Sequence, residues 1–342
     1  MSKLFDKVKN NEVYIIAEMS ANHCGRLDYA LEIVRESAKV GADCLKIQTY
    51  TADTMTIDCN EPYFMISGGL WDGYNLYELY KEATTPWGWQ KRIKEECDKC
   101  GIDFLSTPFD NSSVDFLDSI GVDSYKISSF ELVDIPLIEY AASKNKPMIM
   151  SCGMASLDEI KDAINACVRN GNDQIVLLKC CSEYPANWGE MHLANIPDMI
   201  KKFPYVIGLS DHSIGDYAAL ISVMLGAKVI EKHIKLPNTE SVDSQFSMEV
   251  DEFAKMVDHI RNIPKLIGNV NYGPNGNEVD NMCFRRSLFA IEDIQKGEVF
   301  TDKNVKSIRP GNGLAPKYYK DIIGKTCKRN LKRGEPLLDD LL

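Results

Sequence analysis

Short apolar runs alternate along residues 13–267 with longer segments in which apolar residues recur at helical spacing. Each run has the length and composition of a buried parallel strand and ends in polar residues. We predict eight strands, at residues 13–20, 44–50, 104–108, 124–128, 148–152, 175–180, 207–213 and 229–234. The predicted helices lie at 27–40, 87–100, from 111, 136–143, 157–170, 191–202, 215–226 and 251–267.

Eight strands that alternate with eight helices indicate a (β/α)8 TIM barrel, whose chemistry lies at the carboxyl ends of the strands. A doubly wound open sheet is the alternative, disfavoured because no glycine-rich nucleotide-binding sequence follows the first strand. A long insertion, residues 51–85, interrupts the alternation. After the barrel, residues 1–267, the composition of 268–284 is typical of an exposed linker. Short β-like runs in 285–342 then predict a small, separate, β-rich C-terminal domain.

The composition narrows the class of protein. The 342-residue chain has a net charge of −11 and a hydrophobic content of 44%, as an ordinary soluble globular protein does. The negative charge argues against binding nucleic acid or an anionic membrane surface. No run approaches the roughly 20 apolar residues of a membrane helix, and the charged N-terminus lacks the apolar core of a signal peptide. Eleven scattered cysteines indicate reduced thiols and therefore a cytoplasmic location.

Two of the five histidines occupy equivalent places in the predicted barrel. His212 and His233 lie at the ends of two neighbouring strands that one helix connects. Neutral imidazoles on such a rigid rim need little reorganisation to converge on a divalent metal. The alternative is two unrelated histidines in ordinary environments, but their matching positions favour a metal site.

Lys46 and Lys126 lie within apolar strands, where a charge is costly unless it is paired. Each could pair with a buried carboxylate for stability alone. Two lysines and several hydroxyls on one rim favour a phosphate or carboxylate ligand instead. Glu18 could be a metal ligand, a general base or the partner of a lysine. The residues alone thus predict a metal-assisted barrel enzyme that acts on a small anionic substrate, with a metal-dependent aldolase or isomerase as the alternative.

Several motifs are more specific than this pattern. The sequence IAEMSANHCG at 16–25 resembles the opening motif of the sialic acid synthases, and SIRPGNGL at 307–314 is similar to the antifreeze-like (SAF) domain of that family. The other matching motifs, in order, are KIQT at 46–49, STPF at 106–109, KISS at 126–129, GLSDHS at 208–213 and EKH at 231–233. The chain is therefore identified as a member of the sialic acid synthase family.

The insertion carries a finer resemblance. Its sequence LWDGYNLYELY at 70–80, followed by TPW at 85–87, is similar to a segment of the pseudaminic branch of this family. SFEL at 129–132 and VDSQFS at 242–247 also look like that branch. The chain departs from the common pattern at residues 19–21 and at 24, none of which lies at a position implied to carry chemistry.

The resemblance implies an activity. Members of the family join phosphoenolpyruvate to the open-chain aldehyde of an acylated amino sugar and release phosphate by C–O cleavage. For the pseudaminic branch the implied acceptor is 2,4-diacetamido-2,4,6-trideoxy-L-altrose, and the product is pseudaminic acid, which is used on flagellin and cell-surface glycans. N-acetylneuraminic or legionaminic acid synthesis is the alternative. A non-catalytic sugar-binding protein is a more distant one, disfavoured because the motif residues are intact.

The resemblance also implies residue roles. A divalent ion, Mn²⁺ or in its place Mg²⁺ or Co²⁺, would be held by His212 and His233 and would polarise the aldehyde, while Glu18 would bind the attacking water. The residues implied to hold phosphoenolpyruvate are Lys46, Thr107, Lys126, Ser129, Ser151, Ser182 and Ser210. Those implied to face the sugar are Gln48, Glu131, Tyr184 and Asp243; for the last two, loop structure is the alternative.

The small C-terminal domain contributes one implied site residue, Arg309. By resemblance it reaches into the barrel of a partner subunit and contacts an N-acyl group of the sugar, which implies a domain-swapped homodimer. From the residues alone, Arg309 would be a surface arginine before Pro310.

Overall fold

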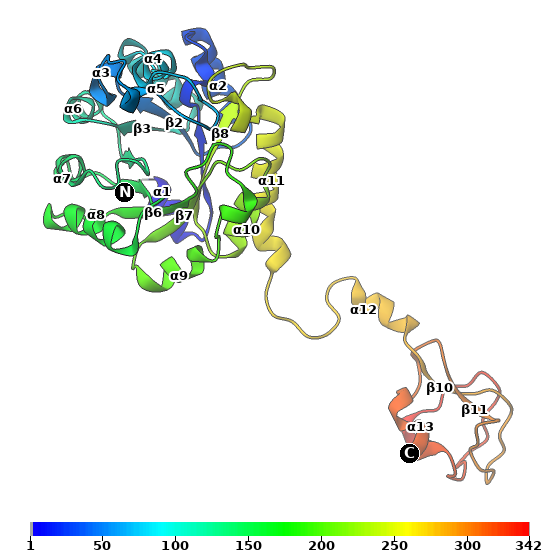
Figure 1. Cartoon of the computed structure of the whole chain (residues 1–342). Helices are drawn as coiled ribbons and strands as arrows, with labels where there is room; N and C mark the ends of the chain where they lie inside the picture. The colour runs from blue at the N-terminus through cyan, green and yellow to red at the C-terminus, as the bar shows by residue number, and fades with distance from the viewer. Residues whose placement is uncertain (1–2, 342) are drawn as a thin grey trace. The chain divides into compact units, whose positions relative to one another are not determined.

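Eight parallel strands close into a barrel in the computed structural model, which describes residues 3–341 (Figure 1). The strands are β1 (Tyr14–Glu18), β2 (Cys44–Thr49), β3 (Asp103–Pro108), β4 (Tyr125–Ile127), β5 (Met148–Ser151), β6 (Ile175–Cys180), β7 (Val206–Asp211) and β8 (Val229–Lys235). Because β1 pairs with both β2 and β8, the sheet has no free edge between its first and eighth strands. The predicted (β/α)8 TIM barrel is confirmed and the open-sheet alternative is wrong.

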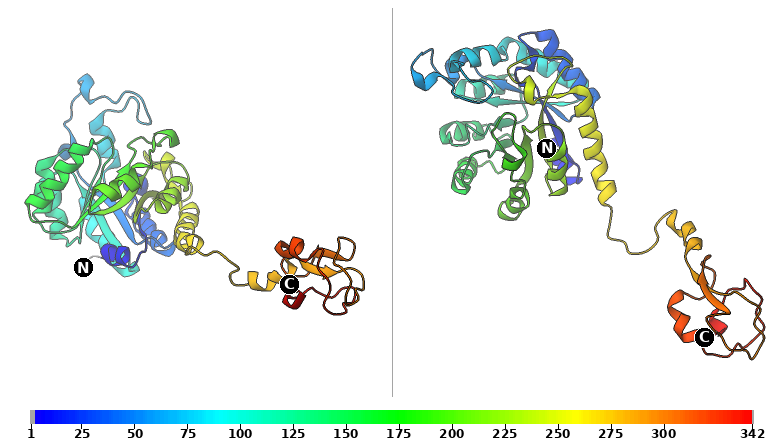
Figure 2. Two further views of the ribbon diagram at one scale, coloured as in Figure 1. Left: turned by 90° about the horizontal axis from the view of Figure 1, so that it is seen from below. Right: turned by 45° about the vertical axis from the view of Figure 1, so that its right-hand side comes forward.

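A layer of helices covers the outside of the barrel, as the two further views in Figure 2 show. The helices are α2 (Leu27–Lys39), α5 (Trp87–Cys100), α6 (Asn111–Ser119), α7 (Ile135–Ala142), α8 (Leu157–Arg169), α9 (Asn195–Lys202), α10 (Tyr217–Met224) and α11 (Val250–Ile267). A two-residue strand, β9 (Met248–Glu249), pairs with β8 just before α11. This outer layer matches the predicted alternation of strand and helix.

Local sequence explains where these helices begin and which face they bury, and α8 is a clear example. Ser156 caps its amino end by accepting from the backbone N–H of Glu159, whose side chain in turn accepts from the N–H of Ser156. Ile160, Ala163 and Cys167 follow at helical spacing and are buried against the barrel. The cap and the apolar stripe together place α8 on the outside of the strands.

Residues on each strand alternate between two cores. On β1, Ile15 and Ala17 pack outward in the core shared with the helices, whereas Tyr14 and Ile16 pack into the barrel interior. Since side chains two apart on a strand share a face, Glu18 also points inward, one step closer to the carboxyl end. The same parity places polar residues of the other strands inside this end of the barrel. The carboxyl end is therefore polar and the amino end apolar.

The N-terminal helix was not predicted. α1 (Lys3–Lys9) closes the amino end of the barrel, where Leu4 is buried in the inner apolar core. Only Leu4 among its residues is fully buried, so α1 lacks the repeating apolar face by which a helix is recognised in a sequence.

The insertion between β2 and α5 is also more ordered than the sequence indicated. It contains α3 (Ala52–Met55), the 3₁₀ turn η2 (Pro62–Phe64) and α4 (Leu76–Ala83). Asn75 caps α4 by accepting from the backbone N–H of Tyr77. The segment projects from one end of the barrel in Figure 2. Other 3₁₀ turns lie in the barrel loops, at η1 (Ser20–His23), η3 (Trp188–Glu190) and η4 (Ser244–Phe246).

A fully buried ion pair ties β7 to β8 on the outward face of the sheet. Lys232 Nζ lies 2.7 Å from Asp211 Oδ2, and it also donates to the carbonyl oxygen of Ser213. The other oxygen of Asp211 accepts from the N–H and the hydroxyl of Ser213. The network fixes the strand ends from which His212 and His233 project inward.

We expect Lys232→Met to lower the free energy of unfolding by about 3–5 kcal/mol, because it leaves Asp211 charged and buried without its partner. Urea unfolding measures this change. The matched control is Lys202→Met, which breaks an exposed ion pair with Asp198 and should cost about 0.5 kcal/mol. Equal losses in the two variants would contradict the structural role of the buried pair.

A second compact unit begins at Gly268, where the first ends at Ile267. Its strands β10 (Ser287–Ala290) and β11 (Val305–Ile308) pair antiparallel, and its short helical elements are α12 (Glu278–Asn281), η5 (Met282–Phe284), η6 (Pro316–Tyr318), α13 (Tyr319–Ile322) and η7 (Asp339–Leu341). Leu288, Phe300 and Leu337 belong to its own apolar core. Two of these elements, α12 and η5, lie within the segment predicted as a linker.

Among residues 3–341, no helix combines the length and apolarity that crossing a bilayer requires.

Candidate functional site

A cavity of about 420 Å³ lies at the carboxyl ends of the barrel strands, a volume suited to a small molecule. The predicted site residues that line it are Lys46, Gln48, Thr107, Lys126, Ser129, Glu131, Ser151, Tyr184, Ser210, His212, His233 and Asp243. They come from most of the strands and from the loops that follow them, so residues far apart in the sequence share one site.

Three predicted residues do not line this cavity. Glu18 is fully buried and contacts Lys46, a residue of the lining. Ser182 lies behind the lining, with its hydroxyl oxygen 3.7 Å from Cys180 Sγ. The third residue, Arg309, follows β11 in the second unit.

Two lysines and two glutamates form a charge cluster at the centre of the site. Lys46 Nζ lies 2.6 Å from Glu18 Oε2, and Gln48 Nε2 donates to Glu18 Oε1 at 3.2 Å. Glu231 lies between the lysines, 3.6 Å from each Nζ. Both lysines thus have carboxylate neighbours, as the purely structural alternative required. Glu231 was noted only as part of a motif, because no local pattern shows that its partners come from β2 and β4.

Burial and these neighbours shift the protonation of the cluster. Burial, with a contribution from Glu231, raises the pKa of Glu18, although Lys46 opposes the shift. Burial would also raise the pKa of Glu231, but Lys126 and Lys46 outweigh it and hold the pKa below its usual value. Burial lowers the pKa of Lys126. Glu18 is therefore the carboxylate of the cluster better suited to accept a proton.

A set of small side chains forms a recess beside the lysines. Lys126 Nζ donates to Ser151 Oγ at 2.7 Å, and the N–H of Gly153 donates to Ser129 Oγ at 3.0 Å. A Cβ at Gly153 would collide with the hydroxyl of Ser182 and come within 2.7 Å of Ser129 Oγ, so both hydroxyls would have to move. The recess offers hydroxyl donors and a nearby cation, as phosphate binding requires.

Buried polar atoms without a hydrogen-bond partner also gather at the cavity. Thr107 Oγ1, Glu231 Oε2 and His233 Nδ1 have none, and all three residues line the cavity. Because such atoms are costly when left unsatisfied, they indicate a ligand or water that completes the site.

The two histidines fit a divalent metal. Their ring centroids are 5.4 Å apart, and His212 Nδ1 lies 2.9 Å from the carbonyl oxygen of Cys181. With the proton on Nδ1 donated to that carbonyl, the lone pair of Nε2 is free to bind a metal. Burial and the neighbouring His212 lower the pKa of His233 well below its usual value, so His233 stays neutral. Among the described residues, no group of three or more His, Cys, Asp or Glu side chains is placed to hold a metal. An ion held by two histidines has coordination positions left for substrate or water.

One neighbour of His212 was missed. Cys180 ends β6, and no base lies near it in the sequence. Its Sγ is 3.8 Å from His212 Nδ1. Burial alone would raise the pKa of the thiol, but His212 lowers it to about 7. The contact joins residues 32 positions apart, which no local sequence pattern shows.

The predicted sugar-facing residues have contacts of their own. The rings of Tyr184 and His212 pack at a centroid distance of 4.3 Å, with their planes tilted by 38°. Asp243 Oδ2 accepts from Ser20 Oγ at 2.5 Å and from the N–H of Ala21 at 3.2 Å. Asp243 therefore does hold loop structure, as the alternative proposed, while it also lines the cavity.

Sequence comparison agrees with this fold. Residues 33–272 match the model of the NeuB family, and residues 285–342 match the SAF domain. Since the family match covers most of the chain, the protein belongs to the NeuB family. The predicted sialic acid synthase resemblance is thereby confirmed.

Individual relatives refine this assignment. The chain is 42% identical to the pseudaminic acid synthase of Campylobacter jejuni over 96% of both chains. It is 35% identical to the N,N'-diacetyllegionaminic acid synthase of the same species, over 94% of this chain and 97% of the relative. Among solved structures, the N-acetylneuraminic acid synthetase of Leptospira borgpetersenii, in complex with citrate, is 32% identical with a TM-score of 0.69, over 80% of this chain and 91% of that one.

Proposed function

We propose that the protein condenses phosphoenolpyruvate with 2,4-diacetamido-2,4,6-trideoxy-L-altrose and water to give pseudaminic acid and phosphate. The observation that supports this most is the site itself, in which Lys46, Lys126, His212 and His233 line one cavity with Glu18 behind them. The choice of acceptor is supported by the higher identity to a pseudaminic than to a legionaminic synthase. N-acetylneuraminic or legionaminic acid synthesis is the alternative.

The lysines and the hydroxyl-lined recess would bind phosphoenolpyruvate. Lys46 and Lys126 would neutralise its phosphate and carboxylate, and Thr107 and Ser210 would donate hydrogen bonds from neighbouring strands. Ser129, Ser151 and Ser182 would complete the recess around Gly153. This arrangement would present the methylene carbon of phosphoenolpyruvate to the aldehyde of the acceptor.

His212 and His233 would hold a divalent ion, Mn²⁺ or in its place Mg²⁺ or Co²⁺. When bound, the ion would supply Lewis-acid polarisation of the aldehyde oxygen. Glu18 would hold the water that adds to the cationic carbon left after C–C bond formation, and take its proton. Its raised pKa suits that role. The acceptor would lie against Gln48, Glu131, Tyr184 and Asp243.

Phosphoenolpyruvate labelled with ¹⁸O at the bridging oxygen tests the proposed chemistry. Incubated with the altrose acceptor and Mn²⁺, the protein should release phosphate that carries the label, because the C–O bond breaks. Unlabelled phosphate would mean P–O cleavage and would contradict the proposal.

We expect Gly153→Ala to raise the KM for phosphoenolpyruvate by about 10- to 100-fold. The new Cβ displaces hydroxyls that would bind an anion, and a hydrogen bond to a charged group contributes about 1.5–3 kcal/mol. Steady-state kinetics measures the effect. The control is Gly88→Ala in α5, where an added Cβ meets no atom within 4 Å. An unchanged KM in Gly153→Ala would show that the recess does not bind phosphoenolpyruvate.

We also propose that the protein works as a domain-swapped homodimer in which Arg309 contacts the N-acyl group of the sugar in the partner's barrel. A chain that ends at Asn277 should then lose turnover while its barrel stays folded. Full activity of that chain would contradict the shared site. A cytoplasmic location is proposed because all eleven cysteines are free thiols.

A further inference from the structure

The cavity has two chemically different sides. The strand ends and their loops contribute charged and polar residues, among them Lys46, Lys126 and Glu131. The insertion contributes Met55, Ile66, Leu76, Leu79 and Ala83, which we call the apolar wall. The wall carries no charge, and its only polar side-chain atom is the weakly accepting sulfur of Met55. A ligand that fills the cavity therefore meets both polar groups and hydrocarbon.

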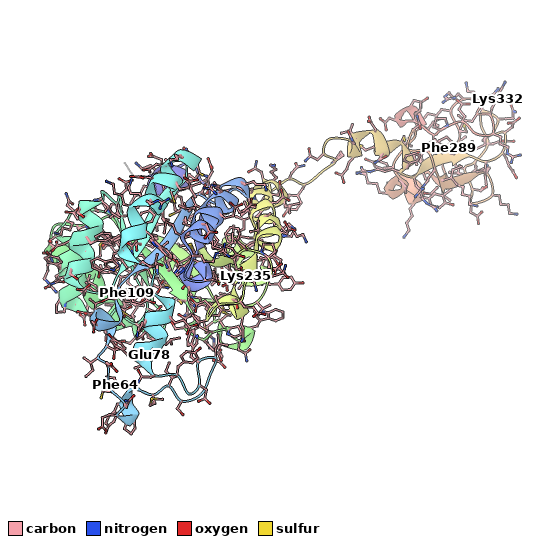
Figure 3. The ribbon with its side chains drawn as sticks, turned by 90° about the horizontal axis from the view of Figure 1, so that it is seen from above. Phe64, Glu78, Phe109, Lys235, Phe289 and Lys332 are labelled. Carbon is pink, nitrogen blue, oxygen red and sulfur yellow. The ribbon has the colours of Figure 1, made fainter. Side chains whose placement is uncertain are left out.

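Two further residues of the insertion line the cavity, and their polar atoms do not change this conclusion. The indole N–H of Trp71 already donates to the carbonyl oxygen of Val242 at 3.0 Å. Tyr80 also brings a hydroxyl to the lining, and burial together with the nearby carboxylate of Glu131, another lining residue, raises the pKa of that hydroxyl. The charged side chains of α4, such as Glu78, are exposed instead (Figure 3).

Trp71 packs the insertion against residues next to the histidines. Its ring lies 5.4 Å from that of Tyr184 and 6.5 Å from that of Phe246. Both of these rings pack on the histidines, Tyr184 on His212 and Phe246 on His233 at 4.8 Å. The insertion is thereby tied to the proposed metal ligands, although its outer tip, near Phe64, projects away from the barrel (Figure 3).

We infer that the apolar wall selects acceptors that end in a methyl group over those that end in a hydroxymethyl group. The inference rests on the proposed function, which places the aldehyde carbon at His212 and His233. The acceptor chain then runs from the histidines towards the insertion, so its far end, carbon 6, meets the wall. A methyl group is buried there favourably, whereas a hydroxyl group would lose its water without gaining a partner.

The expected discrimination is moderate. An apolar pocket rejects a ligand that only adds a hydroxyl by about 10²-fold. We therefore expect kcat/KM for 2,4-diacetamido-2,4,6-trideoxy-L-altrose to exceed that for its 6-hydroxy analogue by about 10²-fold.

Two variants test the wall directly. Ile66→Asn and Leu76→Gln each place an amide at a half-buried wall position, where it can bond a 6-hydroxyl. Each should lower the 6-deoxy to 6-hydroxy ratio of kcat/KM by about 10-fold. The control is Ile57→Asn, a residue of the same insertion that is 60% exposed and does not line the cavity, and its ratio should match wild type. An unchanged ratio in both wall variants, or equal use of the two sugars by wild type, would overturn the inference.

Binding of the two corresponding alditols separates this inference from the proposed function. The alditols lack the aldehyde and cannot condense, so calorimetry reports selectivity without turnover. If wild type releases no phosphate with either sugar, the proposed function fails. The inference about the wall is then still supported if wild type binds the 6-deoxy alditol more tightly than the 6-hydroxy alditol and if Ile66→Asn abolishes this preference. Equal binding of the two alditols by wild type would overturn it.

Discussion

Replacing Glu18 by glutamine is expected to lower phosphate release by about 10²–10⁴-fold, the usual contribution of a general base. The amide has nearly the same volume but cannot take a proton from water. Binding of phosphoenolpyruvate should change little, because Lys46 keeps a second carboxylate, Glu231, at 3.6 Å. Steady-state turnover and calorimetric binding of phosphoenolpyruvate measure the two quantities separately.

A control must distinguish a loss of catalysis from a loss of folding, since Glu18 is buried against Lys46. Urea unfolding of Glu18→Gln shows whether the fold survives. Glu190→Gln makes the same chemical change on a side chain that is 68% exposed and should leave turnover intact. Turnover like that of wild type in a folded Glu18→Gln protein would rule out Glu18 as the base.

The second large effect concerns the histidines. Removal of divalent ions by a chelator should abolish turnover, and added Mn²⁺ should restore it. His233→Gln should weaken Mn²⁺ binding by at least about 100-fold, because even the loss of a group that only orients a metal ligand costs 10- to 100-fold. Calorimetry measures this binding without any substrate.

The matched control for the metal site is His192→Gln, which changes a histidine that is 68% exposed and lies outside the cavity. Its Mn²⁺ affinity should equal that of wild type. If His233→Gln binds Mn²⁺ as tightly as wild type, or if the chelated protein turns over at full rate, the two-histidine metal site is wrong.

The barrel could be predicted because each strand is a short apolar run that ends in polar residues, and each helix carries an apolar stripe. The bounds of β6 and α5 match the prediction, 175–180 and 87–100. α9 begins at Asn195 rather than 191, because the turn η3 occupies residues 188–190 and His192 has a positive φ. Such turns depend on loop packing, which apolar periodicity does not describe.

The positions of the site residues could be predicted because the functional residues of a barrel lie at the strand ends. The residues that they contact could not be predicted. Glu231 lies 185 positions after Lys46 in the sequence. The two side chains are neighbours only because β8 pairs with β1 and closes the barrel. Trp71 shows the same limit. The insertion could be recognised as a break in the alternation of strands and helices, but the contact of Trp71 with Val242 depends on how two loops fold over the barrel.

The comparison of acceptors tests the central claim most directly. Phosphate release from phosphoenolpyruvate with Mn²⁺ is measured with 2,4-diacetamido-2,4,6-trideoxy-L-altrose, with N-acetylmannosamine and with the legionaminic acid precursor. We predict release with the altrose sugar and little or none with the other two. Faster release with N-acetylmannosamine or the legionaminic precursor would agree with the proposed reaction and contradict the pseudaminic acceptor. No release with any of the three sugars would contradict the proposal that the protein is a synthase.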